Sequence, residues 1–86
     1  SGQSVTQWLD AGYQVGTGQM AVADLRADYD QWCSRNARHR AAPSTRWLSE
    51  RIIAHFRSGT ERPVDYHRGA GGKRALAGIM PKPPTE

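Results

Sequence analysis

Hydrophobic and polar positions along the chain predict three helices followed by a β-hairpin. Val5, Trp8 and Leu9 recur at helical spacing, and Ser4 is placed to cap the helix that they indicate. Glycines follow from residue 12 onward, so this first helix is about two turns long. We expect residues 13–20 to form a glycine-punctuated connection with one or two extended residues at its end.

The second helix has the longest apolar face, which continues over about four turns. This face consists of Val22, Leu25, Tyr29, Trp32, Cys33 and Asn36. Asp24 in the first turn and Arg35 in the last turn match the polarity of the helix dipole. Asn36 and the segment 41–43, which ends in proline, then break the helix.

The third helix begins after Ser44, a good N-cap, and ends before Gly59. Its predicted buried stripe is Leu48, Ile52 and Phe56, with Ile53 and Trp47 at the flank. The positions that this stripe leaves on the outside are Thr45, Arg46, Ser49, Glu50 and Arg57.

After residue 60 the apolar period changes from helical to alternating. Val64 and Tyr66 fall on one side of an extended chain, which predicts a strand. The glycine-rich segment 68–72 predicts a turn, and residues 73–80 the return strand. Gly78 inside that strand indicates a bulge or a close backbone approach. Residues 81–86 are rich in proline, so we expect a flexible tail there.

These elements predict an α+β fold that is mainly α, with three helices and a C-terminal β-hairpin wing. This is the plan of a winged helix-turn-helix domain over residues 1–80. In that plan one helix enters a DNA major groove, which is about 12 Å wide, while the hairpin reaches neighbouring phosphates or the minor groove.

Length and composition are compatible with this small domain. The chain has 86 residues, enough for one domain only. It contains no run of 18 apolar residues and no basic-then-apolar leader, so we expect neither a membrane span nor a secretory signal. Cys33 is the single cysteine, which excludes an internal disulfide and fits the reducing cytoplasm of a host cell.

Charge is distributed unevenly along the chain. Residues 1–34 contain one basic and four acidic residues, whereas residues 35–86 contain eleven basic and four acidic ones. Ten of the twelve basic residues are arginines, whose planar donor groups match phosphates and guanine edges. An acidic front and a basic back are typical of a nucleic-acid-binding protein, although an unevenly charged soluble surface would give the same totals.

The candidate DNA contacts lie in three places. The third helix offers side chains at its N-terminus, where the helix dipole also favours a phosphate, and further along its outer face. The turn before this helix and the hairpin tip offer basic side chains. The predicted DNA-binding residues are Ser44, Thr45, Arg46, Ser49, Arg57, Arg38, Arg40, Arg68, Lys73 and Arg74.

Each of these sites has a simpler alternative. Arg46 could pair with Glu50 at i+4 on a solvated helix face. Glu50 repels phosphate, so it either accepts from a cytosine amino group or stays in water. The turn could be a charged loop and the hairpin merely a soluble one. Most aromatic residues fall on core stripes, whereas Trp47 and Tyr66 could also stack on bases of a single strand.

One family resemblance covers roughly residues 4–80. The string Leu25…Tyr29-x-x-Trp32-Cys33, then Arg46-x-Leu48…Ile52, and a hairpin ending Gly78-Ile79 are the residues that carry it. With these residues the chain resembles the C-terminal domain of phage and plasmid primase–helicases, of the type found in satellite coliphages, actinobacterial prophages and poxvirus-like primases. The resemblance implies a winged-helix module that binds origin or primer–template DNA, with the primase and helicase activities in other domains.

Catalysis finds no support in the sequence. Asp24 and Asp28 are spaced i, i+4, but no third residue follows at a spacing typical of a metal site. The three histidines match no zinc motif. Cys33 lies on the apolar face of the second helix, which indicates a core residue. We therefore expect no enzyme activity, no metal and no cofactor.

Two other functions remain compatible with the same fold. One is a stand-alone transcription regulator or excisionase, and the other is a protein-docking module within a replisome. A single helix-turn-helix module binds DNA weakly, so we expect a homodimer or a multidomain parent protein.

Overall fold

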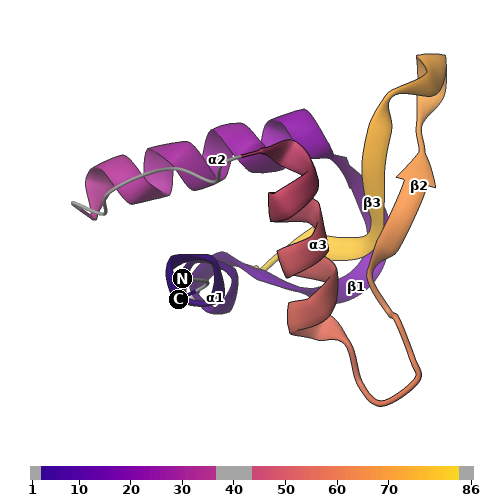
Figure 1. Cartoon of the computed structure of the whole chain (residues 1–86), viewed down its shortest axis with the longest axis horizontal. Coiled ribbons are helices and arrows are strands. Elements are labelled where there is room, and N and C mark those ends of the chain that lie inside the picture. The colour runs from indigo at the N-terminus through magenta and orange to yellow at the C-terminus, as the bar shows by residue number, and fades with distance from the viewer. Residues whose placement is uncertain (1–2, 37–43, 84–86) are drawn as a thin grey trace.

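The computed structural model describes residues 3–36 and 44–83, which form three helices and one three-stranded antiparallel sheet (Figure 1). The helices are α1 (Gln3–Gly12), α2 (Val22–Arg35) and α3 (Thr45–Phe56). The strands are β1 (Tyr13–Ala21), β2 (Asp65–Arg68) and β3 (Arg74–Pro81), with a short 3-10 turn at Ala70–Gly72. The predicted α+β class and the three helices are confirmed, and β2 pairs antiparallel with β3 as two strands of a larger sheet.

The prediction of an irregular connection over residues 13–20 is wrong. This segment is β1, a strand of nine residues that pairs with β3 on the side opposite β2, giving the sheet order β1-β3-β2. The sheet is therefore more than a C-terminal hairpin. The pairing register shifts between Val15 and Gln19, so the glycines in this stretch mark an irregularity inside the strand and not its absence. Pairing with β3 overrides the poor strand propensity of glycine.

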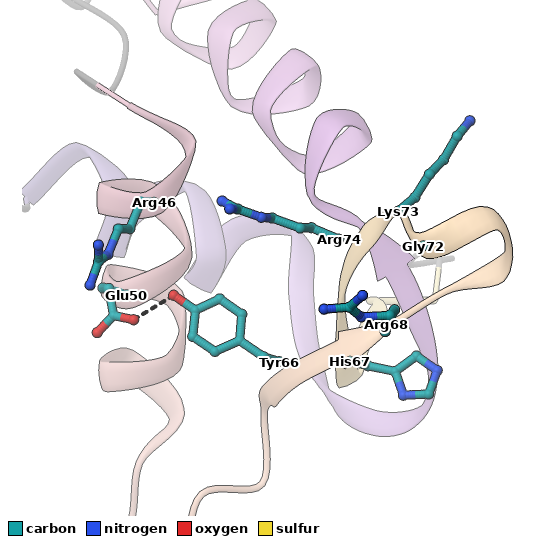
Figure 2. A pocket seen from close by; sticks show the side chains of 8 residues that line it. All are labelled: Arg46, Glu50, Tyr66, His67, Arg68, Gly72, Lys73 and Arg74. Carbon is teal, nitrogen blue, oxygen red and sulfur yellow. Dashed lines mark hydrogen bonds between the residues drawn. The ribbon is translucent and has the colours of Figure 1, made fainter.

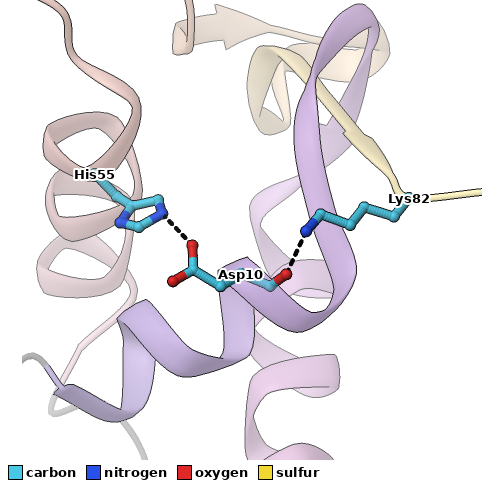
Figure 3. Close-up of polar contacts among 3 residues, drawn as sticks. All are labelled: Asp10, His55 and Lys82. Carbon is cyan, nitrogen blue, oxygen red and sulfur yellow. Dashed lines mark hydrogen bonds and ion pairs between the residues drawn. The ribbon is translucent and has the colours of Figure 1, made fainter.

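The start of the predicted tail is also wrong. β3 includes Pro81, and the Lys82 backbone N–H donates to the Gly12 carbonyl at 2.8 Å. The Lys82 ammonium donates to the Asp10 carbonyl, and the Asp10 carboxylate lies 3.0 Å from His55 Nε2 on α3 (Figure 3). These contacts attach the chain after β3 to the end of α1. Residues 84–86 of the predicted tail lie outside the described residues.

The hydrophobic core lies where the three helices meet the sheet, and the predicted helical stripes form it. The side chains with the least solvent exposure are Trp8, Leu9, Leu25, Leu48, Ile52, Leu76, Ile79, Val5 and Val64. Tyr29 and Cys33 are buried as well, while Trp32, Trp47 and Phe56 pack against the core from its edge. The prediction that most aromatic residues belong to the core is confirmed.

A polar contact joins α2 to the first two elements. The Asp28 carboxylate accepts hydrogen bonds from Trp8 Nε1 at 2.9 Å and from the Tyr13 hydroxyl at 2.6 Å. Burial raises the pKa of Tyr13, and the hydrogen bond to Asp28 adds to this effect. Asp28 thus fixes α1 and β1 against α2, a structural task that the sequence pattern did not indicate.

α3 begins as its sequence predicts. The Ser44 hydroxyl oxygen accepts from the Trp47 backbone N–H at 3.0 Å, with Ser44 in the extended conformation of an N-cap. Leu48 and Ile52 then bury one side of the helix. None of the described helices is both long and apolar enough to cross a membrane.

Gly78 in β3 allows the backbone of Pro63, just before β2, to approach the sheet closely. Its φ is +87°, and a Cβ at this position would lie 1.9 Å from the Pro63 carbonyl oxygen. The predicted close backbone approach is therefore confirmed. It sets Val64, which is buried, against the middle of the sheet and directs β2 along β3 toward the hairpin tip.

Candidate nucleic-acid interface

An open groove of about 450 Å³ lies between the outer face of α3 and the β2–β3 hairpin; we name it the α3–hairpin groove (Figure 2). Two of its residues come from α3 and the others from the hairpin and its tip. They are Arg46, Glu50, Tyr66, His67, Arg68, Gly72, Lys73 and Arg74. The groove thus brings together four of the ten predicted DNA-binding residues, from two segments that are distant in the sequence.

The local structure explains how α3 and the hairpin each bring side chains to this groove. On α3, burial of Leu48 and Ile52 leaves Arg46 and Glu50, four residues apart, on the exposed side. On the hairpin, Arg68 is paired with Arg74 in the antiparallel register, so both side chains leave the same face of the sheet. Figure 2 shows both arginines pointing toward α3.

The α3–hairpin groove is strongly basic. Arg46, Arg68, Lys73 and Arg74 contribute four positive charges against the single carboxylate of Glu50. Among residues 3–36 and 44–83, the ion pairs join other groups, and none involves these four basic side chains. Because no carboxylate of the described residues forms an ion pair with them, their charge is available to an anionic ligand.

A hydrogen bond crosses the groove. The Tyr66 hydroxyl on β2 donates to Glu50 Oε2 on α3 (Figure 2). Partial burial and the Glu50 carboxylate raise the pKa of Tyr66, and the charges of Arg46 and Arg74 oppose this effect. The alternative of an Arg46–Glu50 ion pair is not observed among the described contacts, since Glu50 meets Tyr66 instead.

Ser49 does not lie on the exposed face of α3, and that part of the prediction is wrong. Its side chain is 2% exposed, and its hydroxyl donates to the Thr45 carbonyl at 2.8 Å. Because the serine side chain is small and its hydroxyl is hydrogen-bonded to the preceding turn of the helix, this polar residue can be buried. Ser49 is not available to a ligand in this conformation.

The remaining predicted contacts do not line the groove. Ser44 uses its hydroxyl oxygen as the N-cap acceptor, and Thr45 is exposed at the start of α3. Arg57 follows the C-terminal end of α3, eleven residues after Arg46, which corresponds to about 16 Å along a helix axis. Arg38 and Arg40 lie outside the described residues.

The sequence pattern did not indicate that Glu50 and Tyr66 form a pair. It placed Glu50 on the outside of the third helix and left two roles open for Tyr66. The structure shows Tyr66 as one of the two large hydrophobic residues that are exposed, at 46%, and places it at the groove. No spacing rule connects a helix residue with a strand residue sixteen positions later, so only the tertiary structure could reveal this contact.

The described part of the chain forms neither a metal site nor an exposed stacking surface at Trp47. No group of three His, Cys, Asp or Glu residues there is placed to hold a metal ion. Asp24 is exposed, and Asp28 is engaged by Trp8 and Tyr13. Trp47 packs against the core, with the Arg51 guanidinium 5.3 Å from its ring centroid.

Comparison of the chain with protein-family models, with curated proteins and with solved structures gives no match.

Proposed function

We propose that this chain is a winged-helix DNA-binding domain of a phage or plasmid replication primase–helicase, which binds origin or primer–template DNA through α3 and the β2–β3 hairpin. The element order supports this fold assignment, because a hairpin follows the second and third of three helices. The strand β1 pairs with β3 and so adds a third strand to the β2–β3 hairpin.

The main support for the proposal is the cluster of four basic side chains in the α3–hairpin groove, for which residues 3–36 and 44–83 supply no carboxylate partner. A helix with its side chains is about 10–12 Å across, which fits a DNA major groove about 12 Å wide. With α3 in that position, the hairpin side of the groove lies against the wall of the duplex, where the phosphates lie, and the α3 side turns toward the base edges. Phosphate oxygens are the natural acceptors for three guanidinium groups and one ammonium group.

The expected contacts divide between the helix and the hairpin. Arg46, in the first turn of α3, approaches the phosphate backbone together with the free backbone amides of the helix start. Arg68, Lys73 and Arg74 approach it from the hairpin, where glycines at the tip allow close contact with a sugar–phosphate wall. If all four neutralise phosphates, log K should fall with log salt concentration with a slope of about −3.6.

Fluorescence anisotropy of labelled duplex DNA from about 50 to 200 mM salt tests the proposal, in the range where this dependence is strong. Arg74→Gln should weaken binding and make the salt slope shallower by about 0.9. Arg35→Gln removes the same charge from the end of α2, outside the groove, and should leave the slope unchanged. Absence of binding at low salt, or equal effects of the two substitutions, would refute the proposed interface.

Labelled single-stranded DNA belongs in the same titration. Duplex binding that exceeds single-strand binding supports insertion of α3 into a groove, while the reverse order argues against it. The replication assignment is tested separately, on the full gene product that contains this chain. We expect that product to carry primase and helicase domains; a product without them would favour a stand-alone regulator.

A further inference from the structure

We propose that Glu50 recognises a cytosine in the DNA major groove and that Tyr66 positions it for this task. The inference rests on the proposed DNA-binding function and adds a specificity-determining residue to it. Among the described residues, Glu50 is the one carboxylate that lines the α3–hairpin groove, and it lies among the four basic side chains assigned to phosphates.

A carboxylate at this position weakens phosphate binding by like-charge repulsion. A simple electrostatic site would have no use for it, unless it neutralised a neighbouring arginine. Glu50 does not do so: its partner is the Tyr66 hydroxyl, a neutral donor, and Arg46 at i−4 forms no ion pair among the described residues. Within the described residues the Glu50 carboxylate is therefore not paired with a basic group, and only a donor group on the DNA can approach it favourably.

The hydrogen bond from Tyr66 holds one carboxylate oxygen and leaves the other available. Oε2 accepts from the Tyr66 hydroxyl, whereas the described contacts give Oε1 no partner, and the Glu50 side chain is exposed. Tyr66 is itself fixed in the sheet by its pairing with Leu76, which is fully buried. A flexible side chain is thus held in one orientation before any ligand binds, which reduces the entropy cost of a directional contact.

The chemistry of base edges identifies the partner. In the major groove guanine presents two acceptors, thymine an acceptor and a methyl group, and adenine an acceptor beside its amino group. A carboxylate has no proton to offer these acceptors. Cytosine alone presents an amino donor, N4, without an adjacent acceptor. The exposed oxygen of Glu50 should therefore favour cytosine and disfavour the other three bases at one position of the bound site.

Selection of bound duplexes from a random pool, followed by measured affinities for the four bases at each position, tests this proposal. With the unaltered protein we expect one position at which cytosine is preferred by about tenfold, the discrimination typical of one good base contact. Glu50→Ala should abolish that preference and raise the affinity for unrelated duplexes, because the repulsive charge is gone. Glu50→Gln should shift the preference to adenine, since an amide can bond both N6 and N7.

Two further variants separate base recognition from charge and from folding. Tyr66→Phe retains every charge but frees Glu50, so it should weaken the cytosine preference while leaving the affinity for unrelated duplexes nearly unchanged. Glu61→Gln removes an acidic charge outside the groove and should preserve the preference. Each variant is compared with the unaltered protein by thermal unfolding, so that a loss of structure is recognised.

The outcomes distinguish this inference from the function on which it rests. Duplex binding without a cytosine position, or the same base preferences in Glu50→Gln as in the unaltered protein, overturns the role of Glu50 and leaves the DNA-binding proposal intact. A domain that binds no duplex at low salt overturns both.

Discussion

Arg68 on β2 and Arg74 on β3 lie directly opposite each other in the antiparallel pair that forms the hairpin. Like charges at this position are unfavourable, and no described carboxylate pairs with either of them. The repulsion between the two arginines therefore destabilises the hairpin, and an anion bound in the α3–hairpin groove would reduce this repulsion.

Arg68→Gln should stabilise the free protein while weakening its binding to DNA. Removal of the repulsion should raise the free energy of unfolding by about 0.2–1 kcal/mol at low salt, and the gain should shrink as salt screens the charges. Urea unfolding at two salt concentrations measures this. Arg62→Gln is the matched control: it loses an ion pair with Asp65 at 3.3 Å and should give no gain. A lower free energy of unfolding in Arg68→Gln would show that repulsion between Arg68 and Arg74 does not destabilise the free protein.

Gly78→Ala should strongly destabilise the fold. Its positive φ costs an L-residue about 1–2 kcal/mol, and the contact of a Cβ with the Pro63 carbonyl adds a displacement of the backbone. Gly59→Ala isolates the first effect, because Gly59 has a φ of +62° but open space around its Cβ position. Thermal unfolding should show a much larger loss for Gly78→Ala, and equal losses would mean that the close approach is unimportant.

Asp28→Ala should cost considerably more stability than Asp24→Ala on the same helix. The first change leaves Trp8 Nε1 and the Tyr13 hydroxyl without their acceptor, a loss of about 3–6 kcal/mol for two hydrogen bonds to a charged group. The second removes an exposed acid from the first turn of α2, which is worth less than about 1 kcal/mol. Chemical denaturation of the two variants gives the comparison, and similar values would refute a structural role for Asp28.

Stability should fall in alkaline solution as the buried tyrosines are forced to ionise. Burial raises the pKa of Tyr29 to about 12, with Cys33 as a further cause, from an ordinary value of about 10. The neutral phenol therefore stabilises the folded state fully below pH 10, and this contribution disappears as the pH rises to about 12, by at most about 1.4 kcal/mol per pH unit. Urea unfolding between pH 8 and 11 measures the slope.

Tyr29→Phe removes the titrating group and should flatten this alkaline slope. Tyr66→Phe serves as a comparison, because that phenol lies near the surface and its pKa is raised in part by Glu50. A slope that is unchanged in Tyr29→Phe would assign the alkaline loss of stability to other groups.

Local sequence patterns were sufficient to predict the elements that depend on nearby residues. Apolar spacing located all three helices, Ser44 marked the start of α3, and the glycines at 71 and 72 adopt the positive φ that the predicted turn requires. These features follow from contacts within a few residues of one another, so each is encoded locally. The sequence pattern also predicted that four basic side chains lie on the outside of the third helix and of the hairpin; these are Arg46, Arg68, Lys73 and Arg74.

How those elements pack against one another depends on contacts between segments that are distant in the sequence. β1 exists because β3 offers it a partner, although its own glycines argue against a strand. Ser49 faces inward with its hydroxyl bonded within the helix, and Glu50 meets Tyr66 because β2 lies beside α3 in the folded chain. Such contacts join positions far apart in the chain, and their free energy depends on burial and geometry that no local pattern contains.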